Sequence, residues 1–131
     1  MRPIPSRRAL YLAATAVMIG ESIAGGVLDI ARAAPFYPAM IQLGYPPYFA
    51  TILGAAKLLA VAILLAPGLP RLKEWAYAGI LINMTGAAAS YVANGSGLAN
   101  VVPPVAFALI ALLSWALRTP SPRAHTAKRA D

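Results

Sequence analysis

The chain has 131 residues, of which 60% are hydrophobic and only 11% are charged. Soluble globular domains carry about a quarter of their residues as charged ones, so this composition excludes a water-soluble domain. A membrane-spanning helix needs about 20 consecutive apolar residues, which leaves room for about four such helices. The net charge of +7 would suggest nucleic acid as a partner of a soluble protein. Here the basic residues flank apolar segments, and we expect no nucleic-acid partner.

The chain has no cysteine, which excludes disulfides, thiolate metal sites and thiol redox chemistry. Its one histidine, His125, lies in a polar tail. We therefore expect no metal site and no cofactor intrinsic to the chain. A haem or zinc centre would have to come from a partner.

The first predicted span covers residues 9–30 and follows Arg2, Arg7 and Arg8. Glu21 and Asp29 are the charged residues inside it. A secretory signal peptide is the alternative interpretation, because residues 31–33 resemble a cleavage site with small residues. The length of the apolar run and the acids in its second half favour a retained span.

Three further spans follow the first, and the loop before them, residues 33–47, is rich in proline and aromatic residues. The middle of this loop, residues 39–43, could form a short interfacial helix. A Pro-Gly-Leu-Pro turn ends the second span, and a short charged connection with Arg71, Lys73 and Glu74 precedes the third. The predicted spans two to four are residues 48–66, 75–93 and 101–117, and a basic polar tail covers 118–131. The sequence therefore predicts an all-α membrane bundle of four helices, with its membrane domain in residues 1–117.

The Lys and Arg residues give the orientation, because cytoplasmic loops carry the excess of positive charge. Nine of them fall on the side of the two termini, and Arg32 alone falls on the other. Both termini are therefore predicted to be cytoplasmic, with the tail resting on anionic lipids of the bilayer. Aromatic residues are expected at both interfaces: Tyr11, Trp75, Tyr77 and Trp115 near the termini, and Phe36, Tyr37, Tyr45, Tyr48 and Phe49 opposite.

Two opposite charges are predicted at nearly the same depth in the membrane. With a rise of about 1.5 Å per residue, Glu21 lies about 18 Å and Lys57 about 16 Å from the cytoplasmic edge. An ionised side chain at this depth costs at least about 2.5 kcal/mol, so it needs a partner. We expect Glu21 and Lys57 to pair, either to hold two helices together or as catalytic residues of a buried site. Asp29 and Arg32, in contrast, are expected to form a solvated pair near the outer interface.

Polar residues of the third span are expected to complete this site. Asn83 and Thr85 fall about 12 to 15 Å deep, and a stripe at helical spacing continues through Ser90 and Tyr91 to Asn94 at the outer surface. These side chains are predicted to bind a ligand, with Tyr91 alternatively a plain interfacial aromatic. Small residues four apart, Gly20 with Ala24 and Gly86 with Ser90, could allow close helix contacts.

Four segments carry a family resemblance: Gly44-Tyr-Pro-Pro-Tyr-Phe, Leu53-Gly-Ala-Ala-Lys-Leu-Leu, Thr85-Gly-Ala and the more specific Pro67-Gly-Leu-Pro-Arg-Leu-Lys-Glu-Trp-Ala-Tyr-Ala-Gly. Together they resemble the DoxX-like family of small bacterial four-helix membrane proteins. The resemblance implies one helical bundle in a bacterial inner membrane and a link to quinone-dependent oxidoreduction. Relatives often have an acid in place of Asn83 and a Ser-His pair in place of Ser90-Tyr91. If those residues serve proton chemistry, this chain retains only Glu21 and Lys57.

Four functions fit these observations, and the leading one is binding of a small lipophilic molecule, such as a quinone or an isoprenoid, at the Glu21 and Lys57 site. Oxidoreduction would then need a bound cofactor, such as the quinone, or a partner oxidoreductase subunit. The second function is a membrane isomerase or cyclase with Glu21 as general acid. The third is a non-catalytic accessory subunit, or a homo-oligomer. The fourth, a small multidrug transporter, is disfavoured because Lys57 would compete with a cationic drug for Glu21, and because the charge bias forbids dual topology.

Overall fold

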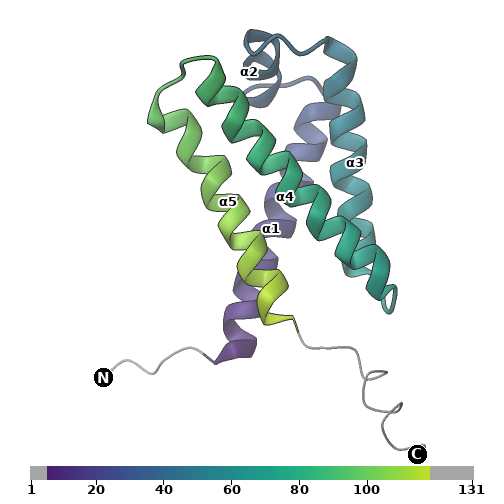
Figure 1. Ribbon diagram of the computed structural model, residues 1–131. Coiled ribbons are helices and arrows are strands. Elements are labelled where there is room, and N and C mark those ends of the chain that lie inside the picture. Colours follow the sequence, from purple (N-terminus) through teal and green to yellow (C-terminus); the bar gives the residue numbers. More distant parts are fainter. Residues whose placement is uncertain (1–5, 119–131) are drawn as a thin grey trace, which may run out of the picture.

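The computed structural model describes residues 6–118, and throughout this range the ordered elements are helices (Figure 1). Four are long: α1 (Arg7–Ile30), α3 (Pro47–Leu65), α4 (Pro70–Ala93) and α5 (Leu98–Leu117). A short helix, α2 (Phe36–Gln42), lies in the loop between α1 and α3. The predicted all-α class is confirmed. Apart from Arg118, the predicted basic tail lies outside the described residues.

Local sequence explains where the long helices begin. The Ser6 hydroxyl accepts a hydrogen bond from the Ala9 amide at 3.1 Å and caps α1. Pro47 and Pro70 occupy the first positions of α3 and α4, where a missing N–H costs nothing. Because α4 begins at Pro70, the three charged residues expected between the second and third spans, Arg71, Lys73 and Glu74, belong to the start of this helix.

The α5 helix begins earlier than predicted, and it includes Pro103 and Pro104 inside its length. Proline has no backbone N–H to donate to the carbonyl four residues before it. The carbonyls of Ala99 and Asn100 therefore lose their usual helical donors. Gly97, in extended conformation, precedes Leu98 as the N-cap residue of the helix.

The four long helices pack as a ring (Figure 1). Helix α1 contacts α3 and α5, while α4, on the other side of the ring, contacts the same two helices. The short α2 contacts α1 and α3. The start of α1 and the end of α5 lie at the end of the ring that is opposite to α2 (Figure 1).

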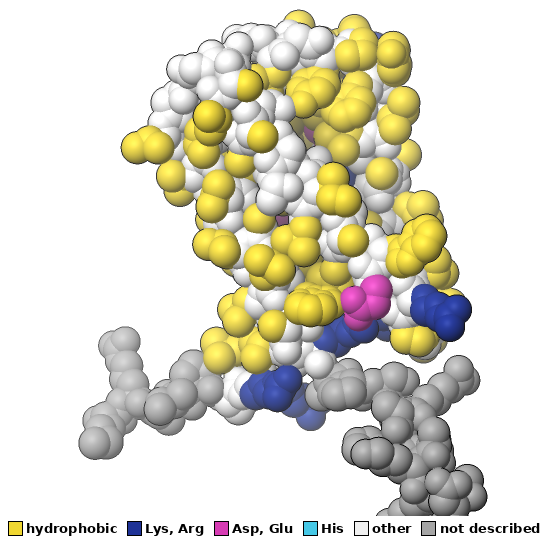
Figure 2. Space-filling view, viewed as in Figure 1, with side chains coloured by type: hydrophobic (Ala, Val, Ile, Leu, Met, Phe, Trp, Pro, Cys, Tyr) yellow, Lys and Arg dark blue, Asp and Glu magenta, His cyan; other side chains and the backbone are white. Residues whose placement is uncertain are grey.

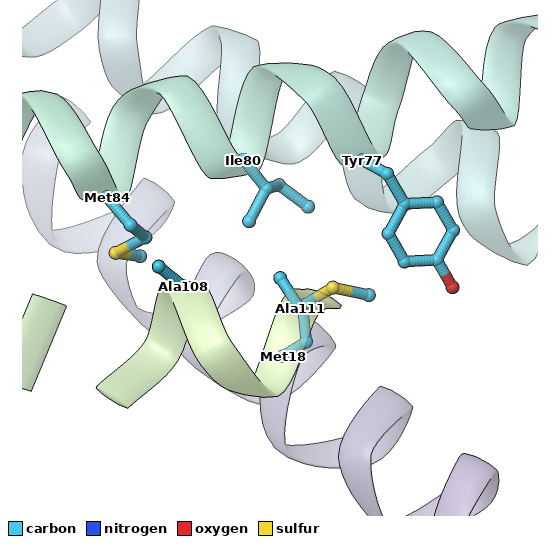
Figure 3. Packing of buried hydrophobic residues seen from close by; sticks show 6 residues of the cluster. All are labelled: Met18, Tyr77, Ile80, Met84, Ala108 and Ala111. Carbon is cyan, nitrogen blue, oxygen red and sulfur yellow. The ribbon is translucent and has the colours of Figure 1, made fainter. Parts of the chain in front are cut away.

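The hydrophobic core lies in the half of the ring near the start of α1. Its buried cluster joins α1, α4 and α5 through Met18, Tyr77, Ile80, Met84, Ala108 and Ala111 (Figure 3). Tyr77, predicted at an interface, is only 2% exposed. Its hydroxyl bonds the Ser114 hydroxyl at 2.8 Å, and Ser114 bonds Thr15 at 2.6 Å. This hydroxyl network ties three helices together at the termini end.

A second polar link joins α4 and α5 at the same end. The Trp115 indole N–H donates to Glu74 Oε2 at 2.7 Å, and Arg118 forms an ion pair with the same carboxylate. Glu74 is the fifth residue of α4. The clasp made by Glu74, Trp115 and Arg118 therefore fastens the beginning of α4 to the end of α5.

The outer surface of the ring is apolar, as Figure 2 shows by the yellow side chains on the visible face. Among the described helices, α1, α3 and α5 are long and apolar enough to cross a membrane. Helix α4 has 24 residues but includes the charged first turn. A fourth span, and the cytoplasmic position of the termini, stay predictions.

Helices α1 and α3 approach each other most closely at two glycines. A Cβ added to Gly54 would lie 2.6 Å from the backbone oxygen of Gly26 and 2.7 Å from a side-chain carbon of Ile30. Close helix contacts were expected instead at two pairs of small residues, Gly20 with Ala24 and Gly86 with Ser90. Neither glycine lies at such a contact, because a Cβ on Gly20 or Gly86 would meet no atom within 4 Å. That prediction is wrong, since small residues are common on every face of these helices.

We expect Gly54→Ala to separate α1 from α3, because the obstructing atom is backbone and cannot move aside. Overpacking of this kind costs about 1–3 kcal/mol. Thermal unfolding in a mild detergent should show a lower melting temperature. The matched control is Gly20→Ala, where alanine has open space and favours helix by up to about 1 kcal/mol. A Gly54→Ala protein as stable as Gly20→Ala would contradict the close approach.

Candidate functional site

A cavity of about 620 Å³ lies among the four long helices, in the half of the ring below α2. Its walls are mostly apolar and aromatic, and its polar residues are few. Acidic atoms are visible deep in gaps of the face shown in Figure 2. The polar lining consists of Glu21, Asp29, Tyr45, Lys57, Asn83, Tyr91 and Asn100, and the aromatic lining includes Phe36, Phe49 and Phe107.

The buried ion pair of this site joins Lys57 to Asp29. The Lys57 Nζ atom lies 3.0 Å from Asp29 Oδ2, and the two side chains are 10% and 0% exposed. The predicted Glu21 to Lys57 pair is not the one formed, and the predicted solvated pair of Asp29 with Arg32 is wrong. The Arg32 guanidinium instead lies over the ring of Tyr37, 6.0 Å from its centroid.

The register of α1 against α3 explains why Asp29 is buried, and the length of the Lys57 side chain explains why it reaches Asp29. The two helices cross at Gly26 and Gly54, so α3 continues about 10 Å beyond the crossing while α1 ends after about 6 Å. Helix α1 therefore stops short of the end of the ring, and α2 covers it. The depth estimate placed the end of α1 at the membrane surface, whereas Asp29 lies inside, within reach of the long Lys57 side chain.

Glu21 lies close to this pair without joining it. A Cβ on Gly25 would stand 3.0 Å from Lys57 Nζ and 3.1 Å from Glu21 Oε1. The absence of a side chain on Gly25 thus leaves the space in which the ammonium and the second carboxylate approach each other. Within residues 6–118, Glu21 forms no ion pair or side-chain hydrogen bond. Its carboxylate faces the cavity.

Aromatic residues from the α2 region close the upper side of the site. Lys57 Nζ lies 5.4 Å from the centroid of the Phe36 ring, a cation–π distance. Tyr45 and Phe49 stack with their centroids 4.8 Å apart, and the Tyr45 hydroxyl lies 2.6 Å from Ser90 Oγ. Phe36, Tyr45 and Phe49 were expected at the membrane interface, but they line the cavity.

The residues predicted on the third span separate into two groups. Asn83 and Tyr91 line the cavity, two helical turns apart on one face of α4. Thr85 does not, because its hydroxyl donates to the backbone oxygen of Leu81 at 2.7 Å on the exposed side. Ser90 donates to Gly86 at 2.8 Å and holds Tyr45 without lining the cavity.

Sequence reasoning missed four contributors to the site: Asp29, Phe36, Tyr45 and Phe49. The available signal was the 33–47 loop, since a proline- and aromatic-rich segment between two spans can fold back over the helix ends. Metal ligands are a separate matter. Within residues 6–118, no group of three His, Cys, Asp or Glu side chains is placed to hold a metal ion; His125 lies outside this range.

A helical ring with an apolar exterior, three helices able to span a bilayer and a charged interior defines an integral membrane protein. Residues 13–114 match the model of the DoxX-like family. The chain belongs to this family, which confirms the resemblance seen in its sequence. No curated protein and no solved structure is significantly similar to the chain.

The two carboxylates beside Lys57 should substitute for each other in stabilising its charge. A buried charge that loses its partner lowers the free energy of unfolding by about 3–5 kcal/mol. Asp29→Asn alone is expected to lower it by less, because the Lys57 ammonium can turn to Glu21. Glu21→Gln alone should have little effect. The double variant should approach the full penalty, and melting temperatures in detergent measure all three. Additive effects of the two substitutions would contradict this arrangement.

Proposed function

We propose that this protein binds a small lipophilic molecule, quinone- or isoprenoid-like, in the cavity between its helices. The observation that carries the proposal is the cavity itself, about 620 Å³ with apolar walls and a few charged groups at one place. Binding sites for small molecules typically have volumes of about 300–1,000 Å³ with such a lining. A ring or an isoprenoid chain fits the walls formed by Phe36, Phe49 and Phe107.

The polar groups fit the head of such a molecule. The Asn83 amide can donate and accept hydrogen bonds, and the Lys57 ammonium has donors beyond the one directed at Asp29. A link to oxidoreduction would run through the bound quinone and a partner subunit, because the chain has no cysteine to carry electrons. Family membership supports a membrane setting for this activity.

We expect Leu53→Trp to fill the cavity and to weaken binding of a benzoquinone with a ten-carbon tail at least tenfold. Leu53 lines the cavity, so the larger side chain takes the place of the ligand. The measurements are a binding titration in maltoside detergent and mass spectrometry of the lipids that copurify. Leu59→Trp is the matched control on the same helix, since Leu59 is 63% exposed on the outside of the ring. Equal binding by both variants would reject the cavity as the binding site.

The proposal includes four membrane-spanning helices, with both termini on the cytoplasmic side of a bacterial inner membrane. Reporter fusions test it: green fluorescent protein fluoresces in the cytoplasm, and alkaline phosphatase is active outside it. Fusions after Gly68 and after Asp131 should fluoresce, and a fusion after Gly95 should have phosphatase activity. If the Gly95 fusion fluoresces instead, α4 does not cross the membrane.

A further inference from the structure

The charges that line the cavity do not balance. Glu21 and Asp29 supply two carboxylates, and Lys57 supplies one ammonium; no other lining residue carries a charge. Lys57 Nζ forms an ion pair with Asp29 Oδ2 at 3.0 Å, which leaves the Glu21 carboxylate as the surplus acid. An uncompensated carboxylate in apolar surroundings is costly, so the site favours a positively charged occupant.

The cavity also has an excess of hydrogen-bond acceptors. Asp29 is 0% exposed, and its Oδ1 atom has no hydrogen-bond partner among the described residues. Ala99 and Asn100 also line the cavity, and the prolines four residues after them have no N–H to donate to their carbonyls. These atoms call for a ligand that brings donors.

Aromatic faces surround the same space. Phe36 already accepts the Lys57 ammonium at 5.4 Å from its centroid, and Tyr45, Phe49, Tyr91 and Phe107 provide further rings along the walls. Aromatic rings attract cations through their negative faces while they exclude water. The walls therefore suit a charged head as well as an apolar body.

We propose that the cavity selects a lipophilic cation, a protonated amine on an apolar body, whose ammonium pairs with Glu21. This inference rests on the proposed function, because it names the head group of the molecule that the cavity binds. The objection to a cationic ligand at Glu21 was competition from Lys57. That objection does not hold, since Lys57 pairs with Asp29.

The test compares geranylamine with geraniol, which share one isoprenoid tail and differ in the head group. Titrations use the full chain in a neutral maltoside detergent near pH 7, with empty micelles subtracted. Geranylamine should bind at least tenfold more tightly than geraniol. The net charge of +7 repels cations from the protein surface, so non-specific attraction does not produce this preference.

Two variants locate the preference at the surplus carboxylate. Glu21→Gln should reduce the amine-to-alcohol ratio to within about twofold, with geraniol binding retained. Asp29→Asn should lower the amine-to-alcohol ratio to the same extent, because Lys57 then pairs with Glu21 and no surplus carboxylate is left. Glu74→Gln is the matched control: it removes an acid that lies outside the cavity and should keep the ratio. Size-exclusion profiles and circular dichroism confirm that each variant is folded.

The outcomes separate the inference from the proposed function. If geraniol binds as tightly as geranylamine, or if the ratio is unchanged in folded Glu21→Gln, the cationic ligand is rejected while the lipophilic cavity stands. If neither compound binds, and Leu53→Trp and Leu59→Trp bind the benzoquinone equally well, the proposed function itself fails.

Discussion

The close approach of α1 and α3 at Gly26 and Gly54 determines how the rest of the site is assembled. A side chain at Gly54 would collide with the Gly26 backbone, and from this crossing α3 extends about 4 Å farther than α1 toward α2. The chain after Ile30 must then turn back over α1, and α2 occupies the vacant position. Asp29 becomes an interior residue as a result. The buried ion pair and the aromatic cover over it both follow from this contact between two glycines.

Charges inside a membrane protein are tolerated only when neighbouring groups compensate them. Two of the three charged residues around this cavity satisfy each other, and the Lys57 ammonium also lies against the Phe36 ring. Glu21 differs because the structure supplies no partner for it among the described residues. A simple salt bridge between helices would need one acid and one base. The second acid, placed beside Gly25 and facing an open space, is not needed for a structural contact and supports the proposed binding site.

Hydropathy was sufficient to predict the helical class, the long helices to within a few residues, and Glu21, Lys57 and Asn83 as polar residues of the interior. The partner of Lys57 could not be predicted from depth. Counted from the crossing of Gly26 and Gly54, Lys57 still lies within about 3 Å of the level of Glu21. The direction in which its long side chain extends, toward Asp29, is not contained in the hydropathy pattern. Thr85 shows a second limit, because its hydroxyl satisfies its own helix and needs no site. Tyr77 shows a third limit, since an aromatic residue near a helix end is predicted to lie at the interface unless the partners of its hydroxyl are known.

The two halves of the ring are built differently, and this gives the molecule a direction. The half near the termini is filled by the core cluster and fastened by the hydroxyl network of Tyr77, Ser114 and Thr15 and by the Glu74 clasp. The open space lies toward α2. A molecule bound as proposed would therefore have packed side chains between it and the end of the ring that holds the termini. Under the proposed function, such an arrangement suits a protein that holds a molecule and does not suit a conduit that runs from one end of the ring to the other.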